Sequence, residues 1–272
     1  MKKYFFYFIG LIIFTSCATK PYADSNKIYR HKAAALAKTL KQKPADKLIA
    51  DSLKISGYWV GTTNFGLRKP NMVIIHHTAQ NSCEQTLKTF TLKRTQVSAH
   101  YVICKDGSVH HLLNDYLRAW HAGISSWGNN KDINSSSIGI ELDNNGYESF
   151  TTAQINNLLV LLDTLKRKYH IPTANFIGHA DVAPTRKNDP NVNFPWQLLS
   201  VHGYGLWYGD TSQVILPVNF NDMQALRIIG YSIRDSSAAI VAFKRHFESK
   251  DSSAVLDDCD KKILYDLMTQ SQ

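Results

Sequence analysis

The chain has 272 residues, four cysteines and a formal net charge of +9, with 31 basic residues against 22 acidic ones. Hydrophobic residues make up 44% and charged residues 19%, the composition of a folded globular chain, which excludes global disorder. Four cysteines are too few for a disulfide-stapled mini-protein of this length. A polytopic membrane protein is also excluded, because the sequence has one apolar run, at its N-terminus.

The N-terminal residues have the pattern of a secretion signal. Two lysines precede an apolar run of eleven residues, Tyr4–Phe14, shorter than the about 20 that a membrane-spanning helix requires. The run leads into Thr15-Ser16-Cys17, which resembles the bacterial lipoprotein signal that is cut before a lipidated cysteine. Phe14 is bulkier than the usual first residue of that signal, and an ordinary signal peptide is the alternative. We expect residues 1–16 to be removed, which lowers the net charge to +7 because both lysines are lost.

The predicted export bears on the oxidation state of the cysteines. The compartment is oxidising, and with Cys17 lipidated, Cys83, Cys104 and Cys259 remain. At most one disulfide can then form within the chain, and Cys83–Cys104 is a candidate pair. No acidic run follows Cys17, so we expect an outer-membrane lipoprotein on the periplasmic face, held to the membrane by its lipid anchor.

Residues 17–55 are polar and basic with weak helical periodicity, and we interpret them as a tether that leads into a surface helix. A basic stripe for anionic lipid headgroups is the alternative. From residue 72 the signals strengthen. The apolar run 72–75 is typical of a buried central strand, and Asp106-Gly107 predicts a hairpin turn. Further strands are expected at 101–103, 109–113, 138–142 and 176–178.

Helices are expected between these strands. Residues 87–92 belong to a short helix, and a longer one begins at a cap formed by Thr151 or Thr152 and is closed by Pro172. One apolar stripe on it consists of Ile155, Leu158, Leu159, Leu162 and Leu165. Strands that alternate with helices indicate an α/β domain over residues 56–208.

The pattern changes after residue 209. Residues 218–272 contain no strand signal and predict a small domain of three amphipathic helices, at 223–229, 236–247 and 257–268.

Four histidines stand out by their local context: His76 in IIHHTA, His100 in SAHY, His121 in AWHAG and His179 in IGHAD. Asp189 follows the last of them by ten residues, with a proline between, which suits a loop that returns to a metal. Two imidazoles and one carboxylate with an open fourth position form a catalytic zinc site. Adjacent strand residues point to opposite faces, so only one residue of the pair His76-His77 can face such a metal.

The motifs VIIHHTA, VSAHYVI, AWHAGISSW, SIGIEL and IGHADVAPTRKNDP…FPW occupy residues 72–196. Their order resembles the zinc-dependent N-acetylmuramoyl-L-alanine amidases of the amidase-2 family, with a T7-lysozyme-like or peptidoglycan-recognition fold, and especially the outer-membrane lipoproteins among them. The resemblance implies a central mixed β-sheet flanked by helices. It also implies one Zn²⁺ per chain, with His76, His179 and Asp189 as ligands, and catalytic roles for Glu141 and Lys187.

These roles suit amide hydrolysis. Zinc lowers the pKa of a bound water from 15.7 to about 7 and polarises the carbonyl. Glu141 would take the proton of that water and deliver it to the leaving amine, and Lys187 would stabilise the oxyanion. A strand-end ion pair and a solvated loop charge are the respective structural alternatives.

Other residues are candidates for substrate contact. We expect His77, His100, His121 and Trp127 near the substrate groove, although hydrogen-bonded support of the fold is an equal alternative for His100 and His121. Trp120 and Trp196 also suit a sugar or peptide groove, with core packing expected for at least one of the tryptophans.

The implied reaction cuts the amide bond between N-acetylmuramic acid and the L-alanine of the stem peptide. Peptidoglycan and muropeptides are the expected partners, since a positive chain is steered toward stem-peptide carboxylates. Residues 218–272 resemble the peptidoglycan-binding module of related amidases, with a structural cap as the alternative. We expect a monomer, and nucleic acid is set aside because no recognition helix or zinc finger is seen.

Two other functions remain alternatives. A non-catalytic peptidoglycan-binding lipoprotein would be expected to lack one of the three ligands. A zinc peptidase acting on cell-wall peptides is compatible with the ligand count but not with the order of the motifs.

Overall fold

The computed structural model describes residues 21–41, 67–249 and 253–272 and divides the chain into two compact units, 1–63 and 64–272. The described part of the first unit is helix α1 (Ala23–Leu40), which buries none of its residues, as expected for a surface helix. The predicted signal peptide and Cys17 lie outside the described residues. In the described ranges, no helix is long and apolar enough to cross a membrane.

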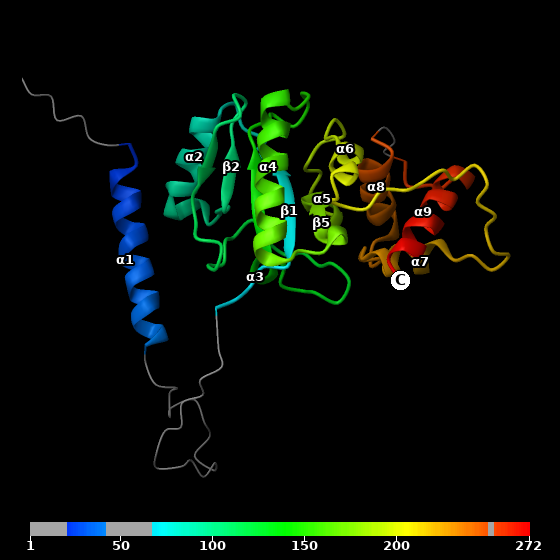
Figure 1. Ribbon diagram of the computed structural model, residues 1–272, viewed down its shortest axis with the longest axis horizontal. Coiled ribbons are helices and arrows are strands. Elements are labelled where there is room, and N and C mark those ends of the chain that lie inside the picture. The colour runs from blue at the N-terminus through cyan, green and yellow to red at the C-terminus, as the bar shows by residue number, and fades with distance from the viewer. Residues whose placement is uncertain (1–20, 42–66, 250–252) are drawn as a thin grey trace, which may run out of the picture. The chain divides into compact units, whose positions relative to one another are not determined.

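The second unit is built on a five-stranded mixed sheet with the order β3-β2-β4-β1-β5 (Figure 1). Neighbouring strands pair in parallel except for the β2–β3 hairpin. The strands are β1 (Met72–His77), β2 (Tyr101–Ile103), β3 (Val109–His111), β4 (Ser137–Leu142) and β5 (Phe176–Gly178). This confirms the predicted mixed sheet, although β3 ends two residues earlier than expected.

Helices cover both faces of this sheet. They are α2 (Cys83–Thr91), α3 (Ile133–Ser136), α4 (Thr152–Tyr169), α5 (His179–Val182) and α6 (Trp196–Val201), with short 3-10 turns at Lys93–Thr95 and Thr173–Asn175. Of the two predicted caps, Thr151 is the one that begins helix α4, in a capping box with Gln154. It ends before Pro172, because His170 adopts a left-handed conformation with φ 54° and stops the helix there.

Strand β1 is buried at every position, as a central parallel strand should be. Val73 and Ile75 pack into the core that includes the apolar stripe of α4, which lies across the sheet in Figure 1. Met72 and Ile74 face the opposite core, with residues of α3, α5 and the segment around Ala122. Side chains alternate along a strand, so His76 continues the second set and points away from α4.

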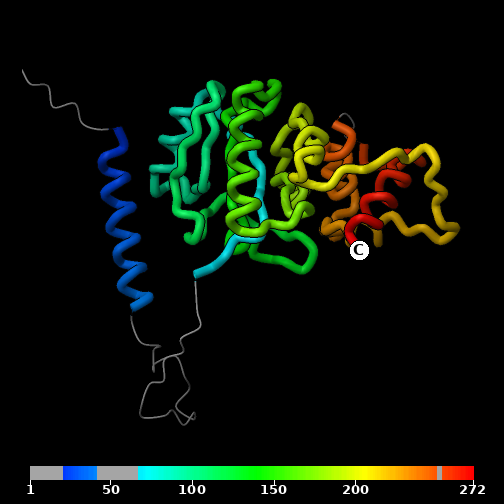
Figure 2. Tube along the Cα trace, viewed as in Figure 1, coloured from blue at the N-terminus to red at the C-terminus, as the bar shows by residue number. Residues whose placement is uncertain are grey.

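The three predicted C-terminal helices are present as α7 (Asp222–Ile229), α8 (Ser236–Phe247) and α9 (Asp258–Gln270). They share an apolar core of their own, with Leu226, Phe243 and Leu264 at its centre. The connection from α6 to α7 runs past these helices and returns to them (Figure 2), and Trp207 from this connection packs on their core.

Cys83, at the start of α2, forms a disulfide with Cys104, directly after β2, with a Cα–Cα distance of 5.3 Å. The pairing offered by the sequence is therefore the one found. Cys259 is free and exposed. The disulfide ties α2 to the sheet, and α2 forms one wall of the pocket described next.

Candidate metal centre and active site

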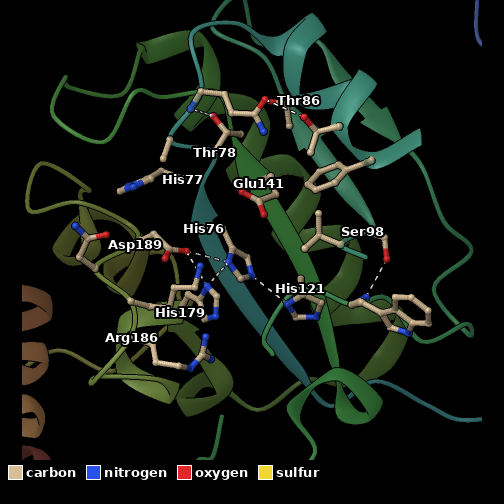
Figure 3. A pocket seen from close by; sticks show the side chains of 18 residues that line it. His76, His77, Thr78, Thr86, Ser98, His121, Glu141, His179, Arg186 and Asp189 are labelled. Carbon is tan, nitrogen blue, oxygen red and sulfur yellow. Dashed lines mark hydrogen bonds and ion pairs between the residues drawn. The ribbon is translucent and has the colours of Figure 1, made fainter. Parts of the chain in front are cut away.

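Three donor atoms meet at the carboxyl ends of β1 and β5. His76 Nδ1 lies 2.9 Å from His179 Nδ1, and each nitrogen lies 3.0 Å from Asp189 Oδ2 (Figure 3). His76 belongs to β1, His179 opens α5 directly after β5, and Asp189 follows in the next loop. All three are at least nine-tenths buried. The structure thus brings together the three residues that the motifs predicted as ligands.

The hydrogen bonds behind His76 determine which of its nitrogens carries the proton. Ser137 Oγ donates to the Ile133 carbonyl at 2.6 Å, so its oxygen accepts from His121 Nε2 at 3.1 Å. His121 Nδ1 is then unprotonated and accepts from His76 Nε2 at 3.0 Å. The Nδ1 lone pair of His76 is therefore left free toward Asp189.

His179 is oriented in the same way. Its Nε2 donates to the Ala122 carbonyl at 3.1 Å, which leaves its Nδ1 lone pair facing His76. Burial lowers the pKa of His76 to about 4, so that imidazole is neutral.

Two nitrogen lone pairs and a carboxylate oxygen thus converge without a proton between them, an arrangement that calls for a cation. Tetrahedral ligands at about 2.0–2.1 Å from zinc lie about 3.3 Å from one another, close to the observed 2.9–3.0 Å. Outer hydrogen bonds that set the tautomer of each histidine are typical of metal centres. The donor set fits Zn²⁺.

Gly139 makes room for this arrangement. A Cβ at that position would lie 2.5 Å from Cγ of His121, well inside van der Waals contact. Only glycine therefore lets the His121 ring lie against β4 and reach His76.

The three donors lie in a pocket of about 280 Å³. One wall comes from α2 and the segment after it, with Phe90 and Val97, and Trp120 stands at this wall with 52% of its surface exposed. The other wall carries Arg186 and Lys187. The pocket therefore joins an apolar side to a cationic side across the metal centre.

Glu141 and Lys187, for which the resemblance implied catalytic roles, both line this pocket. Glu141 on β4 pairs in register with His76 on β1, so the two side chains leave the same face of the sheet. Figure 3 shows the Glu141 side chain between His76 and Thr78. Burial, then the negative charge of Asp189, raise the pKa of Glu141 well above its usual range. A carboxyl group shifted in this direction can accept and return a proton near neutral pH.

The four predicted substrate contacts separate into two pairs. His77 and His121 line the pocket. His77 lies on the side of the pocket away from His121 (Figure 3), and its Nδ1 has no hydrogen-bond partner among the described residues. His121 faces His76 and orients it, as shown above.

The structure does not bring His100 or Trp127 to the pocket. His100 is fully buried, accepts from the Gly139 N–H and contacts the Leu117 carbonyl, which matches its alternative role of supporting the fold. Trp127 packs edge-on against Tyr231 of the C-terminal region. Of the other tryptophans, Trp120 lines the pocket and Trp196 is in the core.

Sequence reasoning missed several supporting residues, and one signal could have found two of them. The strand SIGIEL alternates Ile and Leu with Ser137, Gly139 and Glu141. These three non-aliphatic residues lie on the face of β4 that looks toward the metal donors. Arg186 carried no such signal; its guanidinium donates to the carbonyls of Ala122 and Ile124 and so holds the segment that orients His179.

A buried cluster of two histidines and one aspartate, beside a carboxyl group and a lysine in one pocket, is a candidate site for a mononuclear metal hydrolase. Comparisons with known proteins identify the family. A family model described as N-acetylmuramoyl-L-alanine amidase matches residues 66–192. AmiD of Escherichia coli K12 is 35% identical over 208 residues, which span 65% of this chain and 74% of AmiD. AmpD of Citrobacter freundii is 39% identical over 101 residues, 37% of this chain and 54% of AmpD.

Solved structures agree. E. coli AmiD, in complex with anhydro-N-acetylmuramic acid-L-Ala-D-gamma-Glu-L-Lys, has a TM-score of 0.68 at 28% identity and covers 80% of this chain and 97% of its own. AmpDh3 of Pseudomonas aeruginosa, in complex with an anhydromuramic pentapeptide, has a TM-score of 0.68 at 27% identity, with 81% and 99% covered. The chain therefore belongs to the N-acetylmuramoyl-L-alanine amidase family, which confirms the family and the enzyme class predicted from the motifs.

Proposed function

We propose that this protein hydrolyses the amide bond between N-acetylmuramic acid and the L-alanine of the stem peptide, with one Zn²⁺ held by His76, His179 and Asp189. The observation that carries the proposal is the convergence of two Nδ1 lone pairs and a carboxylate oxygen within 3.0 Å of one another. Muropeptides are the proposed substrates, because AmiD and AmpDh3 were solved with anhydromuramyl peptides bound.

The residues of the pocket divide the chemistry between them. When bound, zinc supplies a Lewis acid and lowers the pKa of water from 15.7 to about 7. Glu141 takes the proton of the attacking water and returns it to the amide nitrogen as the C–N bond breaks. Lys187 stabilises the negative charge that develops on the carbonyl oxygen, for which a well-placed donor contributes about 10²–10³-fold in rate.

The walls of the pocket suit the two parts of a muropeptide. Trp120 presents an exposed ring on the apolar side, suited to the face of a sugar. Lys187 and Arg186 give the opposite side a positive charge that attracts the carboxylates of the stem peptide. Of the four residues predicted to contact the substrate, we keep only His77 in that role. It lines the pocket and does not orient a metal donor.

We also propose that the enzyme is an outer-membrane lipoprotein on the periplasmic face, with residues 1–16 as its signal peptide and Cys17 as its lipid anchor. The sequence of the N-terminus supports this, and the exposed α1, with Lys27, Arg30, Lys32 and Lys38, gives the chain a basic segment close to the anchor. A block of lipoprotein signal processing with globomycin should leave a larger precursor; an unchanged size would exclude Cys17 as the lipid site.

The domains complete the proposal. Residues 17–55 form the tether, 56–208 the catalytic domain and 218–272 a helical domain that binds peptidoglycan. The apolar core shared by α7, α8 and α9 supports a small helical domain in the last segment. A sacculus pull-down with the full mature protein, at a muropeptide concentration that saturates the catalytic pocket, tests whether this domain adds binding.

One digest tests the activity, the bond and the metal together. Muropeptides are incubated with the mature protein, with and without a chelator, and analysed by mass spectrometry. Release of intact stem peptide that stops with chelator and returns with zinc is the expected result. Cleavage inside the peptide would instead indicate a zinc peptidase, and binding without cleavage would indicate a non-catalytic protein.

Two variants separate metal binding from chemistry. Asp189→Ala should lower zinc affinity, because it removes one of three ligands. Glu141→Gln should keep zinc and lose about 10²–10⁴-fold in rate, because it removes the proton acceptor. Full activity of Glu141→Gln with normal zinc content would contradict the assigned role.

A further inference from the structure

A second buried polar cluster centres on Asp181, two residues after the candidate ligand His179. Asp181, in α5, is 2% exposed and accepts three hydrogen bonds of 2.7 Å each. One comes from the N–H of Gly178, in the turn that leads into α5. The other two come from the Tyr231 hydroxyl and from His246 Nδ1. Tyr231 follows α7 and His246 lies in α8, so the C-terminal helices supply two of the three donors.

This cluster is enclosed by aromatic rings. Trp196 stacks on His246 with ring centroids 4.0 Å apart, and Trp127 packs edge-on against Tyr231 at 4.9 Å. Water is excluded from such a setting, so each hydrogen bond to Asp181 is strong and the loss of any donor is costly. The junction between α5 and the C-terminal helices is therefore rigid and specific.

The same short turn positions two of the three metal ligands. His179 is the first residue of α5, between Gly178 and Asp181. The next N–H, that of Ala180, donates to the backbone carbonyl of Asp189 at 2.7 Å. A movement of this turn would displace the His179 imidazole and the Asp189 backbone together.

We propose that Asp181 is a positioning residue through which Tyr231 and His246 of the C-terminal helices hold the metal-binding turn. The C-terminal helices then serve the metal centre itself, in addition to any contact with the cell wall. This inference rests on the proposed zinc site. It explains why Asp181 is buried two residues after the candidate ligand His179 although it does not line the pocket.

Two substitutions at one position test the role. His246→Leu removes the donor to Asp181, whereas His246→Asn can place an amide N–H where Nδ1–H lies; both lose the stacking on Trp196. The full mature protein is loaded with zinc, and the zinc dissociation constant is measured by competition with a chromogenic chelator. We expect His246→Leu to raise this constant about tenfold, the lower end of the range for groups that hydrogen-bond a ligand directly, because His246 acts through the turn that carries His179. His246→Asn should stay within about threefold of the wild-type protein, below that range.

A matched control separates positioning from general stability. Lys244 and Asp260 form a buried ion pair at 2.9 Å within the C-terminal helices. Asp260→Asn should lower the unfolding temperature while leaving the zinc dissociation constant unchanged. If it raises that constant as much as His246→Leu does, the effect is general destabilisation and the inference is wrong.

The remaining outcomes are also decisive. If His246→Leu does not fold, Tyr231→Phe removes a single hydroxyl from the same cluster and takes its place, with the same tenfold criterion. An unchanged dissociation constant in the folded variant overturns the role of Asp181 while the zinc site stands. If the unchanged protein binds no zinc, the proposed function fails first.

Discussion

Replacement of Gly139 by alanine is the most direct perturbation of the metal centre that touches no ligand. The added Cβ would lie 2.5, 2.7 and 2.8 Å from Cγ, Cδ2 and Nδ1 of His121. The ring must therefore move away from β4. Its Nδ1 accepts the hydrogen bond from His76 Nε2, and its Nε2 contacts Ser137, so both contacts are lost or lengthened.

The magnitude follows from these contacts. Overpacking of a buried site costs about 1–3 kcal/mol, and a lost hydrogen bond of this kind about 1 kcal/mol. We expect Gly139→Ala to lower the unfolding free energy of the metal-free protein by about 3–5 kcal/mol, the overpacking cost plus about 1 kcal/mol for each of the two His121 hydrogen bonds. Without its partner, His76 is no longer held with Nδ1 unprotonated, so zinc affinity should fall about 10–100-fold.

Two measurements check this expectation: urea unfolding of the metal-free protein, and zinc competition with a chelator. Gly209→Ala is the matched control, because nothing lies within 4 Å of a Cβ at that position. A zinc dissociation constant for Gly139→Ala within about twofold of the control, well below the effect of a lost outer-shell partner, would refute the assigned role of His121.

Three further predictions concern other parts of the molecule. Burial lowers the pKa of His100 to about 4, whereas a histidine in the unfolded chain has a pKa of about 6.5. The unfolded chain therefore binds a proton first as the pH falls. The contribution of His100 to the unfolding free energy is full above about pH 6.5 and drops by up to about 3 kcal/mol toward pH 4. His100→Asn should reduce the slope of the unfolding free energy against pH by about 1.4 kcal/mol per pH unit between pH 4 and 6.5, measured by urea unfolding. Lys187→Met should lower kcat about 10²–10³-fold at unchanged zinc content, measured by muropeptide turnover and metal analysis. Replacement of Cys83 and Cys104 by serine should cost about 3 kcal/mol in the same unfolding assay, because the disulfide spans a sequence separation of 21 residues.

Local signals in the sequence located most of the elements of the fold. The apolar run at the start of β1 predicted its burial. The apolar stripe on α4 predicted that helix, and its start was narrowed to a cap at Thr151 or Thr152, of which the structure uses Thr151. Such features succeed because periodicity and capping depend on residues within one or two turns of each other. The end of α4 was misjudged, since the left-handed His170, rather than the nearby proline, stops it.

The three candidate metal donors were predicted from motifs, but their arrangement in space was not. His76 and His179 are 103 residues apart, and only the pairing of β1 with β4 and β5 brings their nitrogens to 2.9 Å. His100 and His121 looked equivalent in the sequence. The structure separates them, because one supports the backbone of β4 and the other reaches His76 across Gly139.

By itself, the sequence determined the α/β class, the three C-terminal helices, and the residue types of the candidate metal site. Only the tertiary structure decided which nitrogen of each histidine is free and which histidine supports another. It also decided that Asp181 is held by residues 50 and 65 positions further along the chain. The physical reason is that hydrophobic periodicity records which face of an element is buried, whereas a hydrogen bond between distant residues depends on how those faces pack.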